Sequence, residues 1–186
     1  MNTKPIEELI IQSEENLRIA EAVVDALPAV RHRLAEDFLA RLDARVKKAF
    51  PGWKSEHSGT YFSDRYVNYS FWKPIWEDDY GLTLQFGDYG QKMNFGIYRE
   101  TEKVGDRPYS DELLSAARAA FPQAQTNPWR EAWIPMETPA EDWRKIEILW
   151  RMHKDDSFLD DVAEQLLELA RIGEPIVDQL VKRYQK

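Results

Sequence analysis

Polar and aromatic side chains alternate with large apolar ones along three short segments between residues 66 and 98. Aromatic rings provide stacking surfaces, and amides and hydroxyls provide hydrogen bonds, so this combination suits binding. Such a surface fits a protein partner, a planar or sugar-like small ligand, or the end of a nucleic-acid strand. The side chains that we predict to bind are Tyr66, Asn68, Trp72, Thr83, Gln85, Asn94 and Tyr98.

Charged residues are scarce among these side chains. A solvated sheet face normally carries Lys, Glu and Arg, so their scarcity indicates that something covers or docks on this surface. Two plainer interpretations stay open, an ordinary solvated face and a face covered by the chain's own helices. A non-enzymatic module that binds a protein is our first functional interpretation, and binding of a small ligand or a nucleic-acid end is the alternative.

Catalysis has less support in the sequence. No histidine is at metal-ligand spacing from another, and no nucleophile elbow, phosphate-binding loop, dinucleotide fingerprint or His-Glu-x-x-His motif occurs. The acidic runs at residues 77–79 and 155–161 are explained by a solvated turn and by helix capping. We therefore expect no catalytic residue, metal or cofactor. A nuclease-like or other hydrolase with an unrecognised site is the third interpretation, and its candidates are Asp78, Asp79, His57 and Arg99.

Composition limits the possible partners and location. The net charge is −8 and no quarter of the 186-residue chain is basic, which argues against nucleic acid as a partner. The absence of cysteine excludes disulfides and favours a reducing compartment. No apolar run approaches the roughly 20 residues of a membrane span, and the N-terminus lacks the pattern of a signal peptide. We expect a cytoplasmic protein with no membrane partner.

Three strands are predicted where the side-chain period is two, at residues 66–72, 82–86 and 93–98. Gly87 and Gly90 bound the turn between the second and third of these strands. Together they predict an antiparallel meander with one apolar face. Residues 129–136 predict a fourth strand, placed at an edge because Pro135 cannot donate to a ladder. Ser110 predicts the cap of a short helix inserted before it.

Helices are predicted both before and after the strand segments in the sequence. An apolar stripe at residues 5–27 predicts one helix, and Pro28 divides it from a second that ends near Phe50. The run Thr138-Pro139-Ala140-Glu141 predicts a capping box that starts a helix through about Met152. Asp155 to Ser157 begin the next helix, Gly173 ends it, and Pro175 opens the last one.

These elements predict a single α+β domain over residues 1–186, with a three- to four-stranded meander packed against helices. The N-terminal helix pair occupies residues 1–50, the sheet with its inserted helix residues 57–136, and the C-terminal helices residues 138–186. The stripe at residues 6–27 also suits a homodimer seam.

The order of elements resembles the C-terminal accessory region of bacterial PD-(D/E)XK nuclease-like proteins. The similarity covers about residues 15–185 and rests on Gly52-Trp53 after a long helix, on the aromatic meander and on Trp129-Arg130. The nuclease signature needs an acidic residue two positions before a lysine, and none of the lysines here has one. The resemblance implies an accessory region without the catalytic motif, in a bacterial or phage defence setting.

Overall fold

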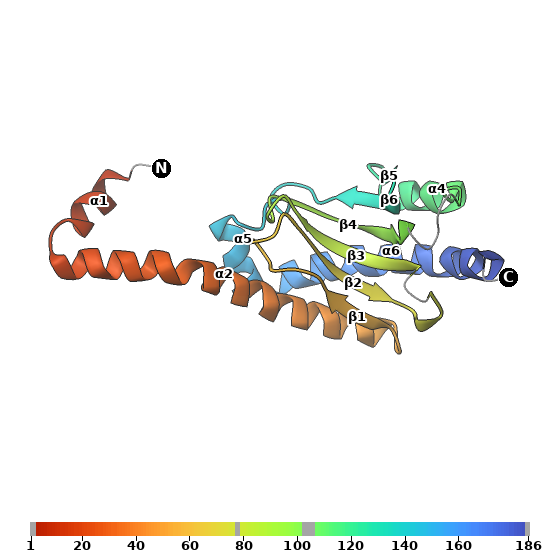
Figure 1. Cartoon of the computed structure of the whole chain (residues 1–186), viewed down its shortest axis with the longest axis horizontal. Coiled ribbons are helices and arrows are strands. Elements are labelled where there is room, and N and C mark those ends of the chain that lie inside the picture. Colours follow the sequence, from red (N-terminus) through yellow and green to blue (C-terminus); the bar gives the residue numbers. More distant parts are fainter. Residues whose placement is uncertain (1–2, 77–78, 102–106, 185–186) are drawn as a thin grey trace.

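Six antiparallel strands form one sheet in the order β1-β2-β3-β4-β6-β5 (Figure 1). The computed structural model describes residues 3–76, 79–101 and 107–184. The strands are β1 (Lys54–His57), β2 (Tyr66–Trp72), β3 (Tyr80–Gly87), β4 (Lys92–Arg99), β5 (Gln125–Asn127) and β6 (Arg130–Pro135). The predicted α+β class and the three-stranded meander of β2, β3 and β4 are confirmed.

The turn between β3 and β4 follows the sequence expectation. Asp88, Tyr89 and Gly90 all have positive φ, at 51°, 60° and 83°. Consecutive left-handed residues suit a tight reversal, and glycine adopts this conformation without steric cost.

The apolar face of the sheet packs against helices that lie behind it in Figure 1. These are α2 (Glu14–Ala49), α4 (Asp111–Ala120), α5 (Ile146–Lys154) and α6 (Asp156–Tyr184). Trp143 joins helix to sheet, because its ring centroid lies 5.2 Å from that of Phe38 on α2 and 5.1 Å from that of Phe86 on β3. Burial of such large rings supplies most of the energy that holds the layers together.

The N-terminal part of the chain projects from this body (Figure 1). Helix α1 (Lys4–Ile10) and the first half of α2 form an arm in which no residue from 3 to 34 is buried. The predicted division at Pro28 is wrong, because α2 runs through Pro28 and the break lies at residues 11–13. Ser13 causes the new start, since its hydroxyl accepts a hydrogen bond of 3.1 Å from the Asn16 amide.

Two strands were not predicted, and one was misplaced. β1 and β5 have four and three residues without apolar alternation. β5 pairs with β6, so β6 is not the edge strand that Pro135 suggested. Pro135 is tolerated because it lies at the end of β6, beyond Trp133, the last residue that β5 reaches.

Two helix ends also differ from the expectation. The capping box does not start α5, because the backbone at Glu141 and Trp143 bonds to β4 and to the β3–β4 turn instead. Met93 donates to the Glu141 carbonyl and Trp143 donates to the Gly90 carbonyl, both at 2.9 Å. Gly173 does not end α6 and Pro175 does not open another helix, because α6 runs through both residues to Tyr184. A Cβ at Gly173 would lie 3.0 Å from Ile97. The small size of Gly173 lets the helix approach the sheet closely.

The short helix after Ser110 is confirmed as α4, and Asp155 caps α6 as expected. A short 3-10 turn, η1 (Pro74–Trp76), follows β2. Within the described ranges, every helix is too short or too polar to traverse a lipid bilayer.

Candidate functional site

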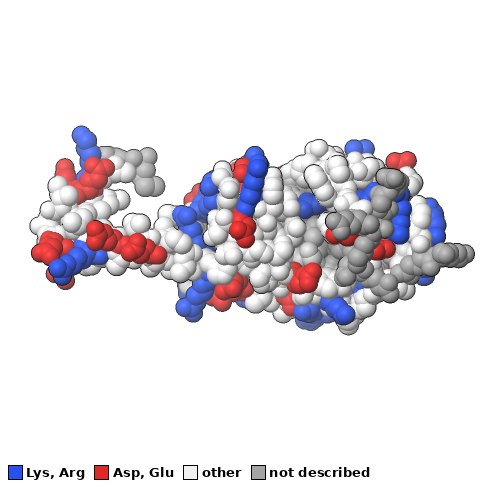
Figure 2. Space-filling view, viewed as in Figure 1, with Lys and Arg blue, Asp and Glu red and all other residues white. Residues whose placement is uncertain are grey.

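The helices cover one face of the sheet and leave the other open, as far as the described chain shows (Figure 1). All seven residues of the predicted binding set lie on this open face, because they occupy alternate positions of β2, β3 and β4. Figure 2 views the molecule from this side, with mostly uncharged atoms over the part of the sheet that grey atoms do not hide.

Three amide side chains form a row across the middle of the open face. Asn68, Gln85 and Asn94 are cross-strand neighbours on β2, β3 and β4. Gln85 Nε2 donates to Asn68 Oδ1 at 2.9 Å, and Asn94 Nδ2 donates to Gln85 Oε1 at 3.3 Å. Each amide fixes the orientation of the next, so the row presents defined donors and acceptors to a bound group.

Arg130 extends the amide row onto β6. Its Nη1 donates to Asn94 Oδ1 at 2.5 Å, and its side chain is only 5% exposed. Burial lowers the pKa of the Arg130 guanidinium to about 10, with a smaller opposing effect from Tyr98. The side chain stays charged at neutral pH. Among the described residues, no carboxylate forms an ion pair with Arg130.

A hollow of about 490 Å³ lies over this row. The hollow is lined by Tyr66, Asn68, Gln85, Tyr98, Asn127, Trp129 and Arg130. The rings of Tyr66 and Trp129 are 56% and 60% exposed, which is high for side chains of this size. The hollow thus combines exposed aromatic surface, oriented amides and one buried cation.

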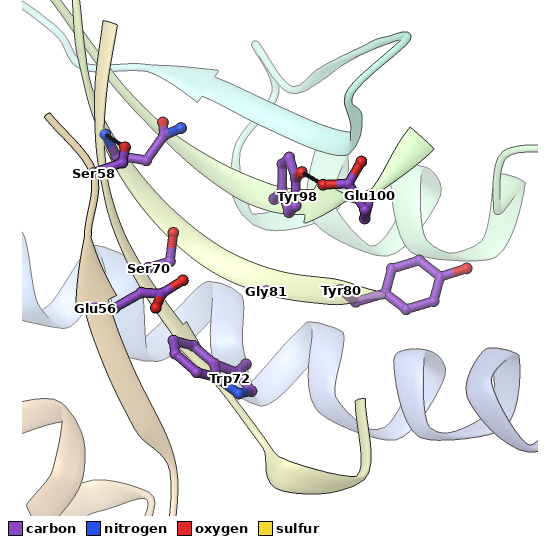
Figure 3. Close-up of a pocket in the computed structure, with 9 residues that line it drawn as sticks. Glu56, Ser58, Ser70, Trp72, Tyr80, Gly81, Tyr98 and Glu100 are labelled. Carbon is purple, nitrogen blue, oxygen red and sulfur yellow. Dashed lines mark hydrogen bonds between the residues drawn. The ribbon is translucent and has the colours of Figure 1, made fainter. Parts of the chain in front are cut away.

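Smaller hollows adjoin it at both ends of the open face. One, of about 220 Å³, shares Tyr66, Gln85 and Arg130 with it and adds Arg65 and Lys92. The other, of about 200 Å³, shares Asn68 and Tyr98 and includes Trp72 and two acidic residues, Glu56 and Glu100 (Figure 3). In that view the Tyr98 hydroxyl donates to the Glu100 carboxylate. The surface is therefore a continuous trough that is cationic toward one end and acidic toward the other.

The seven predicted residues do not all reach this trough. Thr83 is buried, and its hydroxyl donates to the Gly96 carbonyl at 3.3 Å. Its role is therefore in the sheet and not in contact with a ligand. Asn94 is almost buried and acts through Gln85 and Arg130. Tyr66, Asn68, Gln85 and Tyr98 line the large hollow, and Trp72 lines the acidic one.

Sequence reasoning missed three residues that line the large hollow, Asn127, Trp129 and Arg130. They come from β5, β6 and the turn between them. A bulge after Ile97 determines which side chains of β6 lie on the open face beside β4. A local sequence pattern does not predict this bulge. The run Asn127-Pro128-Trp129-Arg130, a turn sequence followed by a bulky ring and a cation, was the available signal.

The candidates for an enzyme do not converge. His57 lies opposite Tyr69, and Tyr69 lies opposite Leu84, whereas Arg99 lies opposite Tyr80. Four residues along β3 separate the two positions by about 13 Å. Asp79 pairs with Arg107 at 3.4 Å, and Asp78 lies outside the described residues. Within the described ranges, no group of three or more His, Cys, Asp and Glu side chains is placed to hold a metal ion.

Comparisons with protein-family models, curated proteins and solved structures found no match to this chain. The site is therefore interpreted from its own geometry, and the resemblance to a nuclease accessory region stays a prediction from sequence.

Proposed function

We propose that the chain is a non-enzymatic binding module that holds a segment of a protein partner in the trough on the open sheet face. The observation that carries the proposal is the exposure of Tyr66 and Trp129 over a hydrogen-bonded amide row. Aromatic residues and arginine are enriched at protein interfaces and contribute most of the energy of binding there. Exposed rings beside ordered polar groups are costly to leave in water and favourable to cover.

The shape of the site favours a partner segment over a small molecule. Three hollows adjoin along the face and share residues, so the surface is long and open. Small ligands are usually enclosed on most of their surface. The one observation in favour of a small ligand is the volume of about 490 Å³, which lies in the usual range of roughly 300–1,000 Å³ for such sites.

A nucleic-acid end has less support. Glu56 and Glu100 share the face, and of its cations Arg65 and Lys92 both pair with Asp88. A phosphate backbone needs several uncompensated cations. Binding of nucleic acid would fall steeply with added salt, whereas an aromatic interface changes little.

The proposal also includes a second interface, through which the N-terminal arms of two copies form a homodimer. Leu17, Val24 and Leu27 repeat at the spacing of a helix seam and are exposed. In an antiparallel pairing centred near Val24, Glu14 and Glu15 of one copy lie near Arg31 and Arg33 of the other. The bacterial or phage defence setting that the resemblance implies is also part of this proposal.

The test compares cross-linked partners of the wild type and of face variants in extracts of the native host. Tyr66→Ala and Trp129→Ala are expected to lose the partner together. Trp150→Ala is the matched control, because Trp150 is also an exposed ring but lies on α5 and does not line the trough. A partner that all three variants retain, or that Trp150→Ala loses equally, would show that the trough is not the binding surface.

A further inference from the structure

Arg130 and Arg99 are both buried at the β4–β6 pair, but of the two only Arg99 forms an ion pair with a described carboxylate. Arg99 is 3% exposed and pairs with the Glu131 carboxylate at 3.3 Å. Arg130, the neighbour of Glu131 in sequence, is 5% exposed and has no carboxylate partner in the described part of the chain. Burying an uncompensated charge costs several kcal/mol in general. A cation kept at this cost indicates a partner from outside the described part of the chain.

The guanidinium of Arg130 has donors left for that partner. It carries five N–H groups, and the hydrogen bond to Asn94 uses one of them. The side chain lines both the hollow of about 490 Å³ and the adjoining hollow of about 220 Å³. The remaining donors therefore border the trough, where a planar acceptor would form the paired hydrogen bonds that arginine favours.

Within the large hollow, Arg130 is the one charged lining residue, and its charge matches a group with one negative charge. The other two cations of the adjoining hollow, Lys92 and Arg65, share one carboxylate, since they lie 3.2 Å and 4.0 Å from Asp88. The large hollow itself contributes only amides and aromatic rings besides Arg130. A phosphate carries up to two charges and is usually held by several cations or backbone amides. A carboxylate needs one guanidinium.

Resting on the proposed function, we propose that Arg130 binds the carboxylate of an aspartate or glutamate side chain of the partner protein. The trough continues past the large hollow in both directions, so a segment can enter at one end and leave at the other. This continuity favours an acidic side chain within the segment over a chain end. Tyr66 and Trp129 cover the aliphatic part of that side chain, and Asn68, Gln85 and Asn127 meet its neighbouring peptide groups.

The test uses blocked amino acids as probes on the full chain. N-acetyl-glutamate N-methylamide is titrated while the Arg130 Nε–H and Trp129 indole N–H signals are followed by NMR. The glutamine analogue, N-acetyl-alanine and inorganic phosphate serve as the neutral, chain-end and phosphate probes. We expect the glutamate probe to shift both signals and the glutamine probe to leave them in place.

Arg130→Met is expected to abolish the shift of the Trp129 indole. Arg171→Met on the exposed side of α6 is the control that removes an equal charge elsewhere and is expected to keep it. The seven tryptophan indole signals report whether each variant is folded. If Arg130→Met does not fold, Arg130→Lys takes its place, and it is expected to weaken the shift because lysine lacks the planar fork.

Equal shifts with the glutamate and glutamine probes, or no shift with either, would overturn the inference. A stronger response to phosphate or to N-acetyl-alanine would overturn the inference too, and would identify a phosphate or a chain-end carboxylate as the group that Arg130 binds. Partner capture separates this failure from failure of the proposed function. Capture that is lost in Trp129→Ala and kept in Arg130→Met leaves the surface standing without the carboxylate, whereas capture unaffected by both removes the surface as well.

Discussion

Arg130 on β6 donates a hydrogen bond of 2.5 Å to the side-chain oxygen of Asn94 on β4. The two residues are not a direct pair in the strand register, since Asn94 lies opposite Pro135 and Arg130 lies opposite Tyr98. The long arginine side chain therefore runs along the open face to reach the amide row. This contact brings a buried cation next to the exposed rings of Tyr66 and Trp129. The stability of the chain and its binding should depend on this arrangement in separable ways.

The first prediction concerns the stability of two arginine variants. Arg130→Met is expected to leave the free energy of unfolding within about 1 kcal/mol of the wild type or to raise it, because it removes a buried charge that has no carboxylate partner in the described ranges. Arg99→Met is expected to lower it by about 3–5 kcal/mol, because Glu131 is then buried without its cation. Urea denaturation measures both. A loss of more than about 3 kcal/mol in Arg130→Met would identify Arg130 as a structural residue.

The second prediction is a pH dependence of the Arg99→Met defect. Burial raises the pKa of Glu131 above its ordinary value of 4.5, while the Ser110 amide and Arg99 oppose the rise. Removing Arg99 raises this pKa further. A folded-state pKa above the unfolded one means that the folded protein binds more protons, so stability is gained as the pH falls through the raised pKa. The defect of Arg99→Met should be smaller near pH 5 than near pH 8.

Denaturation of Arg99→Met and wild type at both pH values gives this comparison. Adding Glu131→Gln to Arg99→Met should remove most of the difference between the two pH values. A defect of the same size at pH 5 and pH 8 would show that the carboxyl group of Glu131 is not responsible.

The third prediction separates two tryptophans of the trough. Trp129→Ala is expected to change the free energy of unfolding by no more than about 0.5 kcal/mol, because the ring is largely exposed. Trp72→Ala is expected to cost more, about 1–3 kcal/mol, because Trp72 is half-buried and packs against the core. Thermal or urea unfolding of the two variants decides the matter. Equal losses would mean that Trp129 is also part of the core.

The fourth prediction addresses the arm. Light scattering after size exclusion is expected to give about twice the chain mass of 21.9 kDa at high protein concentration. Val24→Glu should return the protein to a monomer, because it places a carboxylate in the seam. Ile146→Glu is the control, since Ile146 is equally exposed but lies on α5. A wild-type mass of 21.9 kDa at every concentration would exclude the dimer.

Prediction from sequence succeeded where the information is local. The meander followed from side-chain alternation in β2, β3 and β4, and two helix starts followed from capping by Ser110 and Asp155. It failed where distant contacts compete with local preference. The capping box at Thr138 does not start a helix, because this segment forms hydrogen bonds with the β3–β4 turn and β4. Gly173 lies inside α6, because the helix approaches β4 closely there.

The sequence by itself determined which side chains share a face of the meander, because alternate residues of a strand point to opposite sides. It thereby placed Tyr66, Asn68, Gln85 and Tyr98 on one surface. Only the tertiary structure decided that the described helices lie on the other face and that β6 joins this one through a bulge beside β4. The burial of Arg130 without a carboxylate partner among the described residues depends on residues from four strands, and a local sequence pattern does not specify such a contact.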